Sequence, residues 1–149
     1  KATRDITEYI VDIAKKEGLA DGLSALPEPV ALHLACHARA QNMGQKAAEM
    51  LRLIPEADLK VIERCSGHGG SWGVMEEYFE TAIKVGRPVA RQAKDFGARF
   101  IASECPLAAD HILQGIERQL DDGQSAPARS YHPVELLALA YGLAPELNS

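Results

Sequence analysis

The stretch VALHLAC, residues 30–36, is a short apolar run that ends in a cysteine. The run follows Pro29, and its length and composition are typical of a strand buried within a sheet. Two later segments have the same form, LKVIERC at 59–65 and ARFIASEC at 98–105. The sequence therefore predicts three strands, each followed by a cysteine.

Segments that favour helix lie before, between and after these strands. The apolar residues of 4–17 have helical spacing, and the segment 39–54 is rich in residues that favour helix. Gly86 and Pro88 are expected to end one helix and start another, because proline is favourable in a first turn. The predicted helices are 4–17, 39–54, 74–85, 88–96, 106–120 and 132–142, with a polar linker at 121–130.

Strands that alternate with helices form βαβ units, which build a parallel sheet. We therefore expect an α/β fold of three layers, a small parallel sheet with helices on both faces in the Rossmann manner. A length of 149 residues, 46% of them apolar, suits one domain over residues 1–149. Its expected parts are a helix and loop at 1–28, a βαβ core at 29–120, and a linker and helix at 121–149.

Composition excludes several classes of function. The formal charge is −5, and the sequence has no cluster of Lys and Arg of the kind that binds nucleic acid. No apolar run approaches the roughly 20 residues that cross a bilayer, and no signal peptide is recognisable. The chain does not begin with Met, so we expect a fragment of a longer protein. The odd number of three cysteines favours reduced thiols in the cytoplasm over disulfides.

The three cysteines are expected to gather at one site. Because the carboxyl ends of parallel strands meet at one edge of the sheet, Cys36, Cys65 and Cys105 should lie together where such folds bind ligands. Thiolates suit zinc and iron–sulfur centres. Two further features of the stretch CSGHGG are expected to serve the site. The backbone of Gly67 and Gly69 would approach a cluster closely, and His68 would complete a set of three cysteines and one histidine or bond a cluster sulfide.

Three interpretations of this site remain open from the residues alone. The first is an iron–sulfur centre that transfers electrons. The second is a structural or mononuclear zinc site, formed by the three cysteines and His68, without a redox role. The third is a thiol enzyme in which one cysteine is the nucleophile and His68 is the base. The other histidines, His33 among them, are expected to pack or to form ordinary hydrogen bonds.

Three blocks of the sequence, CHARAQNMG at 36–44, ERCSGHGGSWGV at 63–74 and SECPLAADHI at 103–112, resemble those of the cysteine-rich CCG domain. That domain occurs in heterodisulfide reductase, in the membrane-anchor subunit of anaerobic glycerol-3-phosphate dehydrogenase and in iron–sulfur proteins of lactate utilisation. The resemblance implies that Cys36, Cys65 and Cys105 bind an iron–sulfur cluster. It also implies electron transfer between a dehydrogenase or ferredoxin module and a quinone or disulfide.

The resemblance also shows where this sequence departs from the family. Ser66 and Ala108 stand where the family has further cysteines, which leaves three of five. The implied cofactor is a cubane [4Fe–4S] cluster whose fourth ligand is His68 or an external group. The implied partners are a ferredoxin-like segment and a second CCG domain of the same protein, or a dehydrogenase subunit, and a partner would provide any peripheral association with a membrane. We expect a domain or subunit of an oxidoreductase and assign no catalytic residue.

Overall fold

A computed structural model describes residues 3–42 and 44–143. In chain order, the elements are α1 (Ile6–Lys16), β1 (Val30–His33), α2 (Cys36–Ala40), α3 (Lys46–Leu51), β2 (Leu59–Ile62), the short 3-10 helix η1 (Trp72–Val74), α4 (Glu76–Asp95), β3 (Phe100–Ser103), α5 (Pro106–Glu117), β4 (Ser130–Tyr131) and α6 (Pro133–Ala140). The three predicted strands and the predicted helices at 4–17, 106–120 and 132–142 are confirmed, with slightly shorter bounds.

The sheet has four parallel strands in the order β2-β1-β3-β4. Strand β1 is central and pairs with both β2 and β3, so that His33 lies opposite Ile62 on one side and opposite Ser103 on the other. The strands that precede the three cysteines are therefore direct neighbours. The predicted small parallel sheet is confirmed.

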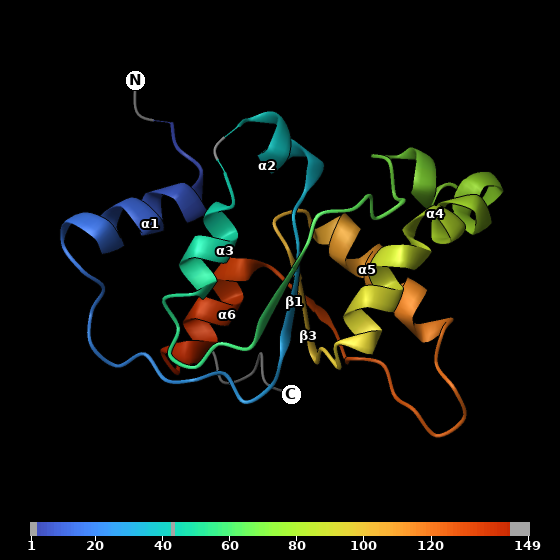
Figure 1. Ribbon diagram of the computed structural model, residues 1–149. Coiled ribbons are helices and arrows are strands. Elements are labelled where there is room, and N and C mark those ends of the chain that lie inside the picture. Colours follow the sequence, from blue (N-terminus) through green and yellow to red (C-terminus); the bar gives the residue numbers. More distant parts are fainter. Residues whose placement is uncertain (1–2, 43, 144–149) are drawn as a thin grey trace.

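Alternate residues of the strands point to opposite faces of the sheet. Val30 and Leu32 pack in the cluster formed with α1, α3 and α6, whereas Ala31 packs in the cluster formed with α4 and α5. Figure 1 shows these two groups of helices on either side of the sheet. The protein therefore has the predicted three-layer α/β architecture, with an apolar core on each side of the sheet.

The segment 39–54 is not one helix, which corrects the prediction. Helix α2 begins at Cys36, so this cysteine is the first residue of a helix and does not precede one. Asn42 and Gly44 then adopt positive φ angles of 52° and 78°, which no helix residue has, and α3 starts at Lys46. Favourable helix propensity over the segment was overridden by this turn.

Helix α4 runs without a break through Gly86 and Pro88, where the sequence predicted an end and a restart. Proline removes one hydrogen bond from a helix interior. The helix continues because its buried stripe extends to both sides of the proline and packs against α5 and the sheet. The stripe consists of Ala82, Ile83, Gly86, Val89, Ala90 and Ala93. Burial of this stripe outweighs the unfavourable propensity of the proline.

A fourth strand lies where the sequence predicted a polar linker. Strand β4 has only two residues, and it pairs with β3 at the edge of the sheet. Its Tyr131 is buried, and the ring meets that of Phe100 edge to face at 5.2 Å between centroids. The linker predicted at 121–130 therefore ends by adding a strand to the sheet.

Helix α1 is capped by Asp5, whose carboxylate accepts hydrogen bonds from the amides of Thr7 and Glu8 at 2.8 and 3.3 Å and from the Thr7 hydroxyl at 2.6 Å. Burial by itself would raise the pKa of Asp5, but these hydrogen bonds outweigh burial and lower the pKa below the ordinary value of an aspartate. Asp5 thus stabilises the fold through its charged form.

Replacing Asp5 by alanine is expected to lower the free energy of unfolding by about 1 kcal/mol at pH 7, because the first turn of α1 loses its cap. A carboxylate whose pKa is lowered by folding stabilises the protein at pH values above its unfolded-state pKa. This stabilisation is lost as the pH falls through the folded-state pKa. The difference in free energy of unfolding between the parent and Asp5→Ala, measured with urea, should therefore become smaller below about pH 4. The exposed Asp21 provides the control, Asp21→Ala, and an Asp5→Ala effect independent of pH would contradict the prediction.

The helices of the described segments were also compared with what a bilayer requires. Among them, none has both the length and the apolar character of a membrane-spanning helix.

Candidate functional site

All three cysteines line one cavity of about 390 Å³ at the carboxyl edge of the sheet. Cys36 begins α2, three residues after the end of β1, and Cys65 lies in the loop after β2. Cys105 is the N-cap residue of α5, two residues after β3. The three cysteines are 29 and 40 residues apart in the sequence, and the pairing of the three strands brings them together. The predicted gathering of the cysteines at one sheet edge is what the structure shows.

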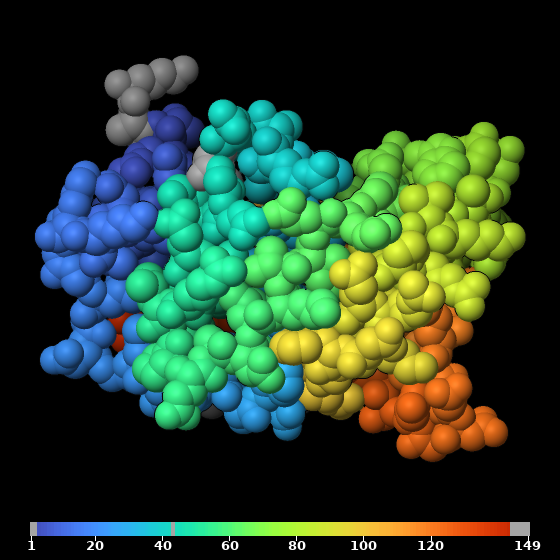
Figure 2. Space-filling model, in the orientation of Figure 1, coloured from blue at the N-terminus to red at the C-terminus, as the bar shows by residue number. Residues whose placement is uncertain are grey.

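The cavity is open to the surface. Cys36 and Cys65 are exposed and Cys105 is half-buried, and none of the three forms a disulfide. In Figure 2, α2 in cyan and the segment that leads into α4 in green form the upper edge of the visible face. The N-terminal end of α5 lies at Cys105, and a helix N-terminus favours a negative charge such as that of a thiolate.

Ser66 and Ala108 also line this cavity and are both buried. These are the two positions at which the resemblance leads one to expect further cysteines. Their placement beside the three thiols agrees with that correspondence. The lining of the cavity therefore carries a hydroxyl and a methyl group at these two positions instead of sulfur donors.

The glycines after Cys65 have two different surroundings. Gly69 and Gly70 line the cavity with positive φ angles of 53° and 66°. Gly67 is buried and does not line it, and a Cβ atom on Gly67 would lie 2.1 Å from the carbonyl oxygen of Ala82. A Cβ atom on Gly86 would lie 2.1 Å from the carbonyl oxygen of Ser66. Glycine at 67 and 86 thus allows the loop backbone to pack directly on α4.

His68 faces Cys105 across the cavity. Its Nε2 lies 3.4 Å from Sγ of Cys105, and its Nδ1 lies 3.0 Å from the carbonyl oxygen of Gly70. Because a carbonyl only accepts hydrogen bonds, Nδ1 carries the proton and Nε2 presents its lone pair to the cavity. This is the arrangement of a histidine that binds a metal with its second nitrogen held by a backbone carbonyl. It is equally the arrangement of an imidazole that accepts a thiol proton.

A buried polar group lies at the floor of the cavity, where the sequence predicted only an ordinary strand histidine. His33 is 2% exposed, with Nε2 at 2.8 Å from the carbonyl oxygen of Arg64 and Nδ1 at 3.1 Å from Oγ of Ser103. Burial lowers the pKa of His33, so the ring is neutral at pH 7. The same Ser103 oxygen accepts the amide hydrogen of Cys105 at 3.3 Å.

Glu104 introduces an acidic side chain beside Cys105. Burial and the neighbouring charge of Asp5 raise the pKa of Glu104, although the hydrogen bond with Thr7 acts in the opposite direction. The Thr7 hydroxyl lies 2.9 Å from Glu104 and 2.6 Å from Asp5. Glu104 therefore connects the end of β3 to the first turn of α1.

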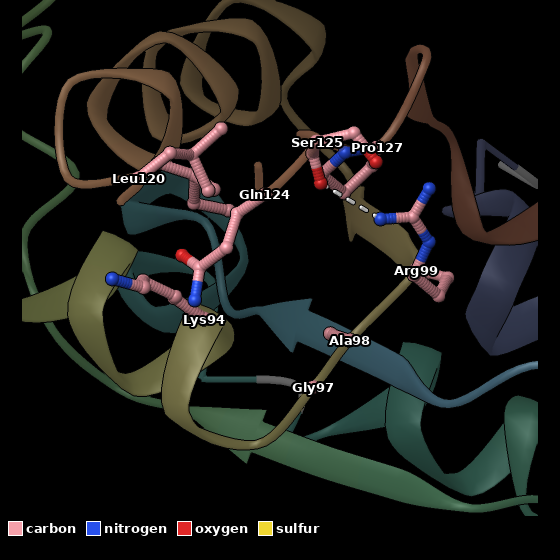
Figure 3. Close-up of a pocket in the computed structure, with 9 residues that line it drawn as sticks. Lys94, Gly97, Ala98, Arg99, Leu120, Gln124, Ser125 and Pro127 are labelled. Atoms are coloured by element: carbon pink, nitrogen blue, oxygen red, sulfur yellow. Dashed lines mark hydrogen bonds between the residues drawn. The ribbon is translucent and has the colours of Figure 1, made fainter. Parts of the chain in front are cut away.

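A second cavity, of about 280 Å³, lies at the opposite edge of the sheet, and Figure 3 shows its lining. Two cationic side chains line it, but both already bind backbone carbonyls. Arg99 donates to the carbonyl oxygen of Ser125 at 2.9 Å, and Lys94 donates to that of Gln119. These contacts hold the chain after α5 against the end of α4 and the start of β3, so the cations have a structural role.

The donor set of the first cavity suits a cluster with several metal atoms. It supplies three sulfur donors and the imidazoles of His37 and His68 around a space about thirteen times that of one water molecule, roughly 30 Å³. Within the described ranges, no three His, Cys, Asp or Glu side chains are arranged to hold one metal ion. Thiolates are the common ligands of iron–sulfur clusters.

Comparison with known proteins adds a family match. The model of the cysteine-rich domain family CCG matches residues 30–107, which include all three cysteines and the strands that carry them. The chain is 30% identical over 125 residues to a subunit of anaerobic glycerol-3-phosphate dehydrogenase of Escherichia coli (strain K12), covering 83% of this chain and 29% of that protein.

A second relative is a subunit of a reductase. The chain is 29% identical over 148 residues to a subunit of the dihydromethanophenazine:CoB--CoM heterodisulfide reductase of Methanosarcina acetivorans, covering 95% of this chain and 34% of that protein. The chain thus spans about a third of the length of these curated relatives. No solved structure gives a significant match.

Proposed function

This chain belongs to the family of cysteine-rich CCG domains, and we propose that it is an electron-transfer domain that binds an iron–sulfur cluster at Cys36, Cys65 and Cys105. The observation that carries the proposal is the convergence of these thiols, from three adjacent strand ends, on one cavity. The names of the relatives, which are subunits of a dehydrogenase and of a reductase, support a redox role.

The residues around the cavity would hold the cluster in distinct ways. The three cysteines would bind iron as thiolates, and the Nε2 lone pair of His68 would supply a fourth ligand, which favours a cubane [4Fe–4S] cluster. The backbone of Gly69 would lie close to the cluster. Gly67 would act indirectly, because it lets the Cys65 loop pack on α4. When bound, such a cluster supplies one-electron transfer.

The proposal also extends to the organisation of the parent protein. The whole described chain acts as one domain in it, and other parts of that protein or a dehydrogenase subunit exchange electrons with it. Two observations support such partners. The chain spans only about a third of its curated relatives, and these relatives are named as subunits. Cys36 and Cys65 are exposed, which would let a partner approach the cluster closely.

The test is the metal content of the protein purified without oxygen. We expect a brown protein with about four iron and four sulfide per chain, the composition of one cubane cluster. Iron, zinc and acid-labile sulfide are measured on the same sample and divided by the protein concentration. A colourless preparation with no iron and one zinc per chain would contradict the proposal and favour the zinc site.

A second candidate function, a thiol nucleophile, is favoured by the contact of 3.4 Å between Cys105 and His68. It predicts that iodoacetamide at neutral pH alkylates Cys105 much faster than Cys36 and Cys65 in protein that has never contained metal. This candidate is weaker because it leaves the other two strand-end cysteines without a role. The same anaerobic sample distinguishes the two candidates, since a nucleophile requires neither iron nor sulfide.

A further inference from the structure

We propose that His33 is a positioning residue that fixes the backbone of Cys65 relative to that of Cys105. The inference rests on the proposed function in one respect, namely that these cysteines are cluster ligands. The hydrogen bonds of His33 themselves are features of the protein without any cofactor.

The direction of each hydrogen bond follows from the chemistry of the partners. The Arg64 carbonyl only accepts, so His33 Nε2 carries the ring proton and donates it. Nδ1 of the neutral ring must then accept, and the Ser103 hydroxyl donates to it. The Ser103 oxygen accepts in turn from the amide of Cys105. Each donor and acceptor in this series has a partner.

The series connects the ends of three strands through one side chain. His33 ends β1 in direct register with Ser103 of β3, and its other nitrogen reaches the segment after β2. The carbonyl of Arg64 belongs to the peptide group that leads into Cys65. Because a peptide group is planar, fixing this carbonyl also fixes the direction in which Cys65 leaves the sheet.

The burial of His33 and Ser103 makes the loss of any of these hydrogen bonds unfavourable. His33 and Ser103 are 2% and 0% exposed, so solvent has little access to the two side chains. A buried polar group without a partner is unfavourable, and this restricts the cysteine-bearing segments to positions that keep the hydrogen bonds. Outer groups of this kind typically change metal affinity by about 10–100-fold when removed.

The first experiment uses no cofactor and measures how fast two thiols of the protein are cross-linked in solution, which depends on their proximity. In the full chain with Cys36→Ser, only Cys65 and Cys105 remain, and the fluorogenic thiol cross-linker dibromobimane reports their proximity. We expect His33→Phe to slow cross-linking about tenfold, the size of effect that loss of a buried hydrogen bond has on an equilibrium, since the phenyl ring fills the site without any nitrogen. His33→Gln keeps a donor near the Nε2 position and should restore most of the rate.

The second experiment uses the anaerobic protein with all three cysteines. We expect His33→Phe to lose iron to a chelator about 10–100-fold faster than the parent, with a shifted reduction potential. The matched control is His111→Phe, because His111 is 3% exposed on α5 and does not line the cavity. Thermal unfolding of both variants separates a local effect from a general loss of stability.

The outcomes separate this inference from the proposed function. If His33→Phe cross-links and retains iron at the parental rates while its melting temperature falls as in His111→Phe, His33 has only a packing role and the inference is overturned. If the parent binds no iron but His33→Phe still slows cross-linking, the positioning role stands and the cluster proposal fails. If His33→Phe does not fold, Ser103→Ala replaces it in both experiments, with the same expected results.

Discussion

Replacing Cys105 by serine is expected to lower the iron bound per chain at least about tenfold. Loss of a group that only supports a metal ligand already lowers metal affinity by about 10–100-fold, so loss of a ligand itself should have at least this effect. Cys105 lies at the N-terminus of α5 and faces His68 across the cavity, so its replacement removes one of the three proposed ligands. Serine has nearly the same shape but a much poorer donor for a soft metal. The folded structure without metal should therefore be retained.

The measurement is iron and sulfide per chain after anaerobic purification of parent and variant side by side. Ser66→Ala is the matched control, because Ser66 lines the same cavity but contributes no thiol. We expect this control to keep the parental iron content. If Cys105→Ser retained the iron content and the visible spectrum of the parent, Cys105 would not be a ligand.

Replacing Gly86 by alanine is expected to lower the free energy of unfolding by about 3 kcal/mol. The added methyl group would lie 2.1 Å from the carbonyl oxygen of Ser66, and a backbone atom cannot move aside as the end of a flexible side chain does. Either α4 or the loop after Cys65 must shift. Iron content should fall as well, since the shift displaces one of the proposed ligands.

Urea unfolding of the metal-free protein measures this effect. Gly115→Ala is the matched control, because Gly115 is also a helical glycine, on α5, and its added methyl group would meet only the side chain of Ala90 at 3.0 Å. Its effect should stay within about 1 kcal/mol, since helix propensity favours alanine. If the two variants lost the same free energy of unfolding, the close contact between Gly86 and the Ser66 carbonyl would not be the cause of the effect.

The sheet and the positions of the cysteines could be predicted from the sequence because both follow from short, strong patterns. A buried strand appears as an apolar run, and parallel strands present their carboxyl ends at one edge. The cysteines at 36, 65 and 105 come directly after such runs. The direction of the strands places all three cysteines at one edge of the sheet, whereas their meeting at one cavity also depends on the strand order, in which β1 lies between β2 and β3.

The errors arose where packing overrides local preference. Pro88 predicted a break, but burial of the stripe on both sides of it keeps α4 continuous. A strand of two residues such as β4 has no periodicity to recognise. The bonds of His33 depend on the register of β1 and β3 and on the path of the chain after β2, and no local pattern carries this information.

The position of β1 at the centre of the sheet has a consequence for biosynthesis. The three cysteine-bearing strand ends become neighbours only after β1 has paired with β2 on one side and with β3 on the other. Synthesis from the N-terminus supplies the third cysteine last, after the 20 residues of α4 have been made. A nascent chain that stops before β3 can therefore present at most two of the three thiols. Under the proposed function, insertion of the cofactor has to follow translation of the whole segment.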